Sequence, residues 1–343
     1  MREGAASMKP AIGKRPLRRI SKTAGVLALA FVLVPSGSAQ ETTFRARSNV
    51  VTVPVLVRDE RGQAVYGLNA ADFLVQDDGV AQTVQMDEAS ESEPISMVVA
   101  LQTGRRAFRE FGRMQGLAAM LEPILALPES RVALLEFDSA VNLAQNFGHD
   151  PAGITSALQH LEPGDGGAAI LEAVQFSVRL LEESPQRHRR VLLLISETRD
   201  HGSQDAKIEK VVADVGNSNV LVYALPFSPS WSQVLDTERG SNRDEGRTSG
   251  DLLAPLMMAS QSVRRNTPRA IATMTGGEYE LFSSRKSFER LMTEFTNHLH
   301  SRYLLSFEPK DPHPGLHAIR VQLRSPEKRS VLARNSYWAE AAR

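Results

Sequence analysis

The feature that most constrains the fold is an alternation, in the middle of the chain, between short apolar segments and helical patterns. Four segments are mostly apolar: 95–101, 131–137, 191–195 and 220–225. Between them, apolar residues recur three and four positions apart, the spacing of an amphipathic helix. Strands that are apolar on both sides belong to a sheet covered by helices on both faces. We therefore predict an α/β fold with a doubly wound, mostly parallel sheet, and segment 141–147 as an antiparallel partner at its edge.

Segments on both sides of this region have the composition of β-strands. Four candidates precede it and three follow it: 50–57, 64–66, 73–75, 83–86, 303–307, 318–323 and 330–333. Neither group has enough strands to cover its own apolar face. We therefore predict that residues 40–93 and 302–343 form one small β-sandwich, with an α/β domain, residues 94–301, inserted between its halves. Within that domain, the polar stretch 226–251 is expected to be a flexible surface loop.

Residues 1–39 have the three-part pattern of a secretory signal peptide. Seven basic residues and one acidic residue accompany an apolar run, Ala24–Val34, and small residues lead up to Ala39. A helix over this run would rise only about 16 Å, whereas the core of a bilayer is roughly 30 Å thick. We predict cleavage after Ala39 and export to the periplasm, the cell surface or the medium. The pair Arg18 and Arg19 leaves open whether export follows the general secretory or the twin-arginine route.

The chain has no net charge, but its charged residues are unevenly distributed along the sequence. The chain holds 40 basic residues, 40 acidic residues and no cysteine. The lack of cysteine excludes disulfide scaffolds, zinc ribbons, iron–sulfur clusters and thiol nucleophiles. Removal of the predicted signal peptide, with its seven basic residues and one acidic residue, leaves a mature chain of net charge −6. Such a chain offers no basic surface to nucleic acid, and no membrane span is expected after cleavage.

Short segments spread over nearly all of the predicted mature chain have an order and spacing typical of one family. They are Val53–Asp59, Gly62, Gly67–Leu68, Asp72–Phe73, Asp78–Gln82, Val191–Ile195, Asp200, Gly202–Ser203, Ala272, Thr275–Gly277, Tyr303–Pro309 and Ala333–Tyr337. On these segments the chain resembles the VWFA-related domain family of secreted bacterial proteins, a branch of the von Willebrand factor type A group. The resemblance implies a Rossmann-like α/β domain of the von Willebrand factor type A kind.

Proteins of this group typically bind a divalent cation at the carboxyl ends of the sheet strands, in a metal-ion-dependent adhesion site. The resemblance implies ligands from Asp-x-Ser-x-Ser after the first buried strand, and from a Thr and an Asp in later loops. These are the hard oxygen donors that Mg²⁺ requires. In this chain the five positions hold Gln102, Gly104, Arg106, Ala168 and Glu197, of which Glu197 alone is a carboxylate. We interpret the metal site as degenerate and expect no cofactor, with bound Mg²⁺ as the less favoured alternative.

Two arginines, Arg105 and Arg106, stand where a cation would need negative charge. One hypothesis is that either guanidinium replaces the cation and pairs with Glu197, because a guanidinium presents a fixed fork to a carboxylate. The alternative is that both arginines point into solvent. We use the term rim for the loops at the carboxyl ends of the parallel strands, which also include Asp200. Fixed arginines on the rim favour a protein partner that offers an acidic segment.

Some residue types used in catalysis occur close together, but without the arrangement that catalysis needs. Ser196, Asp200 and His201 offer the residue types of a hydrolytic triad, yet an adjacent Asp and His cannot adopt its geometry. The chain also has no Gly-x-Ser-x-Gly elbow. The glycine-rich segment 164–167 lacks the Lys-Ser/Thr of a phosphate-binding loop. No catalytic residue is predicted.

The histidines are expected at the surface rather than in a metal site. They are His149, His160, His188, His201, His298, His300, His313 and His317. His298 and His300 are two residues apart on a predicted helix, a spacing that does not face one point. His313 and His317 lie on either side of a Pro-Gly turn, with no carboxylate cluster nearby in the sequence. We therefore predict no metal ligands among them.

These features predict a non-catalytic, exported protein-binding or scaffold module that presents its rim to a partner. Crevices outside the carboxyl ends of the strands are the usual binding sites of open α/β sheets. Two alternatives stay open. The first is a divalent-cation-dependent adhesion module, and the second is a secreted hydrolase, which we rank lower because a fold alone specifies no chemistry.

Overall fold

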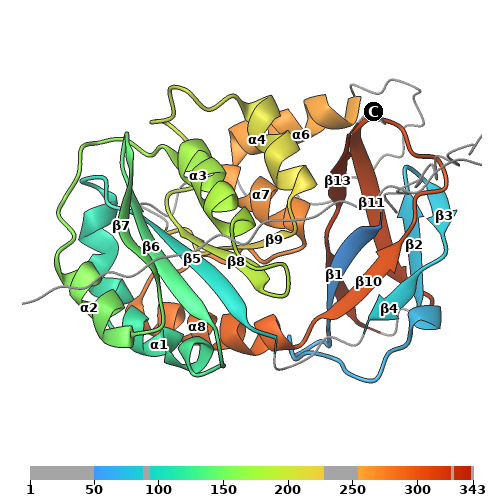
Figure 1. Ribbon diagram of the computed structural model, residues 1–343, viewed down its shortest axis with the longest axis horizontal. Helices are drawn as coiled ribbons and strands as arrows, with labels where there is room; N and C mark the ends of the chain where they lie inside the picture. The colour runs from blue at the N-terminus through green and yellow to red at the C-terminus, as the bar shows by residue number, and fades with distance from the viewer. Residues whose placement is uncertain (1–49, 88–92, 228–253, 326–327, 341–343) are drawn as a thin grey trace, which may run out of the picture. The chain divides into compact units, whose positions relative to one another are not determined.

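The computed structural model describes residues 50–87, 93–227, 254–325 and 328–340, which all belong to one unit spanning residues 48–343. Its central sheet has the strand order β7-β6-β5-β8-β9 (Figure 1). The strands are β5 (Ile95–Gln102), β6 (Arg131–Phe137), β7 (Val141–Gly148), β8 (Arg189–Ile195) and β9 (Val220–Ala224). All run parallel except β7, which pairs antiparallel with β6. The predicted fold class is confirmed.

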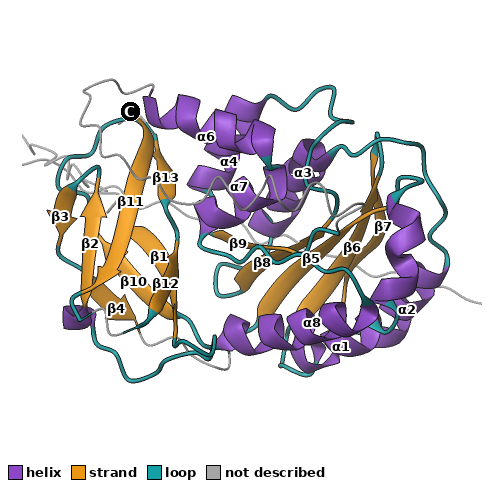
Figure 2. Ribbon diagram, turned by 180° about the vertical axis from the view of Figure 1, so that it is seen from behind, coloured by secondary structure: helices purple, strands orange, loops and turns teal. Residues whose placement is uncertain are grey.

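Helices cover both faces of this sheet, which is why its strands are apolar on both sides. Met97 and Val99 of β5 pack into one core with α1 and α8, whereas Val98 and Ala100 pack into a second core with α3, α4 and α7. The helices on the first face are α1 (Leu117–Leu125), α2 (Pro151–Gln159) and α8 (Arg285–His300). Those on the second face are α3 (Ile170–Glu182), α4 (Ile208–Asn217), α6 (Ala254–Arg265) and α7 (Thr267–Thr275). Figure 2 shows the two helical layers on opposite sides of the sheet.

Strands from both ends of the described chain form two antiparallel sheets. One sheet has the order β12-β1-β10-β4, with β12 (Ser330–Ala333), β1 (Val51–Arg58), β10 (Tyr303–Phe307) and β4 (Gln85–Asp87). The other has the order β13-β11-β2-β3, with β13 (Ser336–Ala339), β11 (Gly315–Leu323), β2 (Phe73–Asp77) and β3 (Val80–Gln82). Val53, Phe73 and Leu305 belong to a core that both sheets share. Because β1 lies between β10 and β12, the N-terminal strand needs both C-terminal strands to complete its pairing.

A buried ionic cluster lies between α7, α8 and the start of β10. The Glu278 carboxylate is 2.9 Å from His298 Nδ1 and 3.2 Å from Arg302 Nη2. Arg302 also donates to the Tyr223 hydroxyl (3.0 Å) and to the Gly276 carbonyl (2.6 Å). Burial raises the pKa of Glu278, but the hydrogen bond from His298 and the charge of Arg302 outweigh it and hold that pKa below its ordinary value. The cluster therefore fixes where the chain leaves the α/β region for the sandwich.

Some local features differ from the sequence predictions. Residues 64–66 do not form a strand: Ala64 makes one bridge to Arg58, and the side chain of Tyr66 is exposed. The segment follows a turn at Gly62 and has no further ladder partner in the described part of the chain. Helix α2 was not predicted, although Asp150 directly before it caps its first turn. Strands β3 and β13 were also missed, since the sequence pattern led to no strand prediction at residues 80–82 or 336–339.

Two predicted segments fall on residues that the structure does not describe. The signal peptide of residues 1–39 lies wholly outside the described ranges. The predicted loop 226–251 does so as well, apart from Pro226 and Phe227. In the helices of the described residues, none combines the length and the apolar character needed to cross a membrane.

Candidate functional site

The rim is formed where β5, β6 and β8 end, because the carboxyl ends of parallel strands meet at one edge of a sheet. Gln102 is the last residue of β5, Asp138 directly follows β6, and Glu197 lies in the loop after β8. The glycine-rich loop of residues 164–167 reaches the same edge, since the Gly164 N–H donates to the Thr103 carbonyl (2.9 Å). The tertiary structure thus brings together the positions that the resemblance assigned to a metal site.

The buried side chain of Gln102 connects three loops of the rim. Its Oε1 accepts a hydrogen bond from the Glu197 N–H (2.8 Å), and its Nε2 donates to the Gly167 carbonyl (3.4 Å). A primary amide has a donor and an acceptor and can make both bonds, whereas a carboxylate has no hydrogen to give to a carbonyl. This geometry suits Gln at position 102 and would disfavour an aspartate there.

The backbone at Gly104 and at Gly202 leaves no room for a side chain. A Cβ at Gly104 would lie 2.6 Å from the Gly167 carbonyl oxygen, and one at Gly202 would lie 2.7 Å from the Ala168 backbone nitrogen. Ala168 itself is fully buried and its carbonyl accepts a hydrogen bond from the His201 N–H (3.2 Å). At position 104, where the resemblance implies a serine, the loops are packed too closely for one.

Glu197, the remaining carboxylate, has a histidine as its partner. Its Oε2 lies 2.9 Å from Nε2 of His201, and its side chain is mostly buried. Arg105 and Arg106 are both exposed, and in the described residues neither forms an ion pair with Glu197. Arg105 instead donates its backbone N–H to the Asp165 carbonyl (2.5 Å). The structure therefore shows the two arginines on the solvent side of the rim.

The Asp200 carboxylate is engaged in capping a helix. Its Oδ2 accepts hydrogen bonds from the Leu171 N–H (2.8 Å) and from the Ser203 hydroxyl (2.6 Å). Leu171 lies in the first turn of α3, where backbone N–H groups lack helical partners and the helix dipole favours a negative charge. Asp200 therefore holds the loop after β8 against α3.

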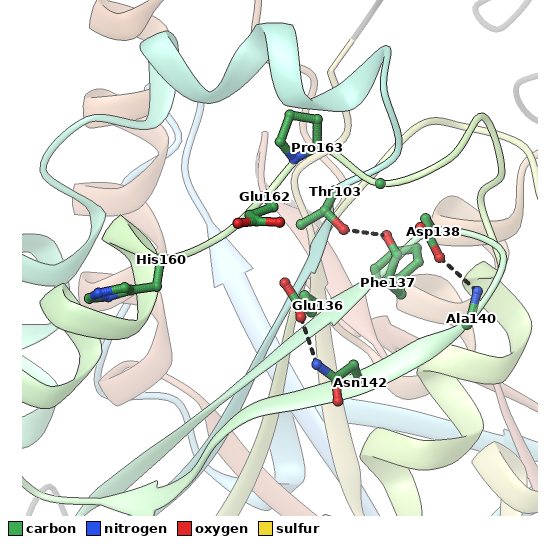
Figure 3. Close-up of a pocket in the computed structure, with 10 residues that line it drawn as sticks. Thr103, Glu136, Phe137, Asp138, Ala140, Asn142, His160, Glu162 and Pro163 are labelled. Carbon is green, nitrogen blue, oxygen red and sulfur yellow. Dashed lines mark hydrogen bonds between the residues drawn. The ribbon is translucent and has the colours of Figure 1, made fainter.

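A pocket of about 340 Å³ lies next to this edge of the sheet (Figure 3). Three carboxylates line it: Glu136, Asp138 and Glu162. Two of them are held by neighbours, because Asn142 Nδ2 donates to Glu136 (2.7 Å) and the Ala140 N–H donates to Asp138 (2.8 Å). These residues were not predicted from the sequence. The available signal was the position of Glu136 and Asp138 around the end of a predicted parallel strand.

The residues of the candidate triad are close in space but not aligned for catalysis. The Ser196 hydroxyl donates to the Glu197 carbonyl (2.8 Å), while Nε2 of His201 faces the Glu197 carboxylate. Asp200 is occupied by the cap of α3. In the described residues, no hydrogen bond joins Ser196 to His201, so the hydroxyl has no base aligned with it.

The prediction that all histidines lie at the surface is wrong for three of them. His188, His298 and His317 are 7%, 6% and 0% exposed. His188 contacts the Ser96 hydroxyl (2.9 Å) and His298 contacts Glu278, so a polar partner compensates burial in each case. The partners of His317 come from β2 and the turn after it, far away in the sequence, which is why sequence spacing did not reveal them.

Comparison with known proteins supports the resemblance. Residues 100–200 match the family model described as the von Willebrand factor type A domain. A search of curated proteins found no match. Similar solved structures include a von Willebrand factor type A protein from Catenulispora acidiphila (8% identity, 86% of this chain and 74% of that chain, TM-score 0.43). BatB from Bacteroides thetaiotaomicron matches at 14% identity over 60% of this chain and 98% of its own (TM-score 0.39). Proximal thread matrix protein 1 from the mussel byssus matches at 10% identity over 60% and 48% (TM-score 0.42).

Proposed function

Starting from an α/β region of the von Willebrand factor type A kind, we propose that this chain is an exported, non-catalytic protein-binding or scaffold module. Its binding surface is the rim, and it works without a bound metal ion. The partner is a protein that offers an acidic segment to Arg105 and Arg106.

The observation that carries the proposal is the hydrogen bonding of Gln102. The resemblance implies a cation between the end of β5 and the later rim loops. In this chain the Gln102 amide spans those loops instead, through Glu197 and Gly167. The bonds hold the loops in place with neutral groups, so the rim is organised without the charge of a cation.

Arg105 and Arg106 support an acidic partner. Both side chains are exposed at the rim, directly after the buried Gly104. Guanidinium groups suit interfaces because they bind carboxylates through two hydrogen bonds and lose hydration more readily than ammonium groups do. Glu136, Asp138 and Glu162 lie in the neighbouring pocket, so the rim carries charges of both signs. Such a surface selects a partner by charge pattern as well as by shape.

The test is affinity capture from the native host with the tagged mature chain, comparing wild type with R105A/R106A. A matched control is R264A/R265A, which removes two adjacent exposed arginines from α6. We expect R105A/R106A to capture a partner about tenfold or more less well than wild type does, because the loss of anchor residues from an interface typically has an effect of this size. The control variant should retain it. Equal capture by all three proteins would contradict the rim proposal.

A second comparison distinguishes this proposal from cation-dependent adhesion. Capture is repeated in the presence of EDTA, and Mg²⁺ binding is measured by isothermal titration. A rim organised by Gln102 should bind its partner equally well with the chelator. Loss of the partner in EDTA, together with Mg²⁺ binding that E197A abolishes, would establish the cation-dependent alternative instead.

A further inference from the structure

Three potential metal ligands from distant parts of the sequence meet in the sheet β13-β11-β2-β3, where β2 ends and the neighbouring strand β11 begins. Asp78 lies in the turn between β2 and β3, His313 lies before β11, and His317 lies near its start. Their ligand atoms all fall within 4.8 Å of one another. We propose that Asp78, His313 and His317 form a binding site for a divalent transition metal ion of the zinc type.

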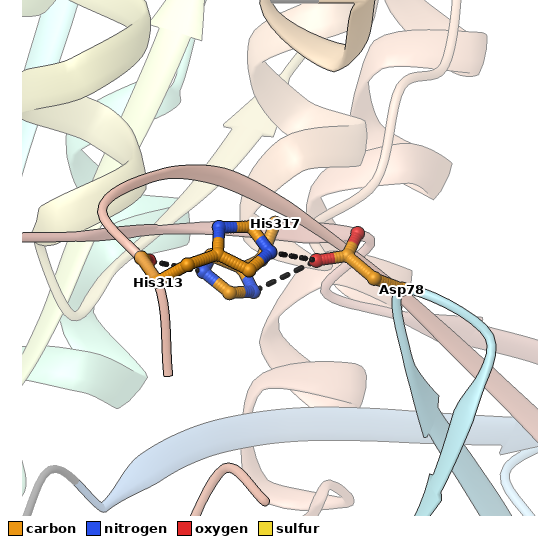
Figure 4. Close-up of side chains that lie close together, drawn as sticks. All are labelled: Asp78, His313 and His317. Carbon is orange, nitrogen blue, oxygen red and sulfur yellow. Dashed lines mark hydrogen bonds and ion pairs between the residues drawn. The ribbon is translucent and has the colours of Figure 1, made fainter. Parts of the chain in front are cut away.

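The spacing of the donor atoms fits such an ion. The Asp78 carboxylate oxygen Oδ2 is 2.8 Å from Nδ1 of His317 and 3.2 Å from Nε2 of His313 (Figure 4). Zinc holds its ligands tetrahedrally at about 2.0–2.2 Å, which places neighbouring donor atoms about 3.3–3.6 Å apart. The separation of 3.2 Å is close to an edge of a zinc coordination tetrahedron, and the separation of 2.8 Å is somewhat shorter.

The ring of His317 is held in the orientation that a ligand needs. Its Nε2 lies 2.7 Å from the His313 carbonyl and can donate to it, so Nδ1, which faces the carboxylates of Asp77 and Asp78, is the nitrogen that would bind a metal once it has lost its proton. The ring is fully buried, stacked between His313 (centroids 3.9 Å apart) and Tyr337 (4.6 Å). Asp78 is held as well, because its Oδ1 accepts the Ala318 N–H (2.9 Å). One oxygen anchors the carboxylate, while the other faces the histidines.

The charges around the site suit a divalent cation. Asp77 is buried beside it, with Oδ1 3.2 Å from Nδ1 of His317 and Oδ2 accepting the Tyr337 hydroxyl (2.9 Å). Asp77 and Asp78 bring two carboxylates to the site, and one divalent ion would balance their charge. Protonation of the histidines is the competing way to balance them. Burial lowers the pKa of His317, but its hydrogen bonds to Asp77 and Asp78 outweigh burial and raise that pKa to about 10, so a bound ion has to displace a proton from this ring.

The ligand types indicate which metals belong here. Imidazole with a carboxylate suits zinc, copper, nickel and iron, whereas Mg²⁺ and Ca²⁺ prefer sites built almost wholly from oxygen. The side chains of His313 and Asp78 are 30% and 31% exposed, so an ion can enter from solvent. Three protein ligands leave a fourth position for water or for a donor from a partner.

The test is metal binding by the full chain carrying no polyhistidine tag, after removal of metals with EDTA. Zn²⁺ is the probe for isothermal titration, and Co²⁺ is the probe for visible absorption spectroscopy. The variants are H313A and D78N, because the buried His317 is needed for packing. A matched control is H160A, which removes an exposed histidine from the end of α2. Far-UV circular dichroism and thermal unfolding without metal confirm that each variant is folded.

We expect the wild type and H160A to bind one Zn²⁺ per chain and to give the intense absorption of tetrahedral Co²⁺. H313A and D78N should each lose at least about tenfold in zinc affinity. Even the loss of a residue that only hydrogen-bonds to a metal ligand typically costs about tenfold or more, and these variants lose a ligand itself. The absence of stoichiometric Zn²⁺ binding by the wild type would overturn the proposal. Equal binding by folded H313A, D78N and H160A would also overturn it. Neither result bears on the rim, so failure here leaves the proposed function testable separately.

Discussion

The Gln102 side chain accepts a hydrogen bond from the Glu197 backbone N–H at 2.8 Å, where the neighbouring strands β5 and β8 end. The same side chain donates to Gly167 in a third loop. It is 2% exposed, so these bonds form away from water, where an unsatisfied polar group is costly. The relationship explains how the rim keeps its shape with Gln, Gly and Ala at positions where the resemblance implies oxygen ligands.

Replacing Gln102 with glutamate should destabilise the chain by about 1–3 kcal/mol, because the carboxylate cannot donate to the Gly167 carbonyl. The free energy of unfolding is measured by denaturant titration followed by circular dichroism. Q204E adds the same charge at an exposed glutamine and should change little. If Q102E equals Q204E in stability, the Gln102 bonds do not hold the rim.

Replacing Gly104 with alanine should also destabilise the chain, by about 1–3 kcal/mol, since the new methyl group would meet the Gly167 carbonyl at 2.6 Å. The matched control is G112A, where an added methyl group has no neighbour within 4 Å. Thermal unfolding of both variants checks the prediction. A stable G104A would mean that the loop of residues 164–167 moves easily and that position 104 could accept a serine.

Replacing Asp200 with alanine should cost about 1 kcal/mol or somewhat more, the typical value for loss of a helix cap. D200N should cost less, because its amide oxygen can still accept the Leu171 N–H, although the favourable charge at the helix N-terminus is lost. Hydrogen exchange at the first turn of α3 provides a local measurement. Unchanged protection in D200A would show that Asp200 is not needed as a cap and is free to contact a ligand.

Replacing Glu278 with glutamine should cost about 3–5 kcal/mol at neutral pH, since it leaves Arg302 buried without its charged partner. The pKa of Glu278 is lower in the folded protein than its ordinary value of 4.5, so its ionised form stabilises the fold above that pH. This stabilisation should be lost as the pH falls through the lower, folded pKa. The difference in unfolding free energy between wild type and E278Q should therefore shrink at acidic pH.

The control for this pH dependence is E289Q, because Glu289 pairs with Arg285 on the exposed side of α8. Exposed pairs of this kind contribute little, so its unfolding free energy should follow the wild type at every pH. A constant difference between E278Q and wild type from neutral to acidic pH would contradict the depressed pKa of Glu278.

Features that depend on a short stretch of sequence could be predicted, whereas features that depend on contacts between distant segments could not. Residues 95–101 and 191–195 predicted buried parallel strands, because an apolar run has few other stable placements. The strand predicted at residues 64–66 was wrong, since a strand needs a ladder partner and those residues have a single bridge. The rim residues do lie in loops at the carboxyl ends of the strands, but the side-chain contacts that they make there were not predicted. Of the two hypotheses for Arg105 and Arg106, the described residues fit the one in which both point into solvent, and the partner of Glu197 is His201.

The sequence alone determined the α/β class, its four buried parallel strands and the antiparallel strand at the edge of the sheet. All of these follow from residue type and periodicity along the chain. Only the tertiary structure decided that Gln102 spans the rim loops, that Glu278 is buried beside Arg302 and that His317 meets Asp77 from 240 positions away. Such contacts depend on angstrom-scale packing between distant segments, and local sequence patterns carry no information about which distant side chains will meet.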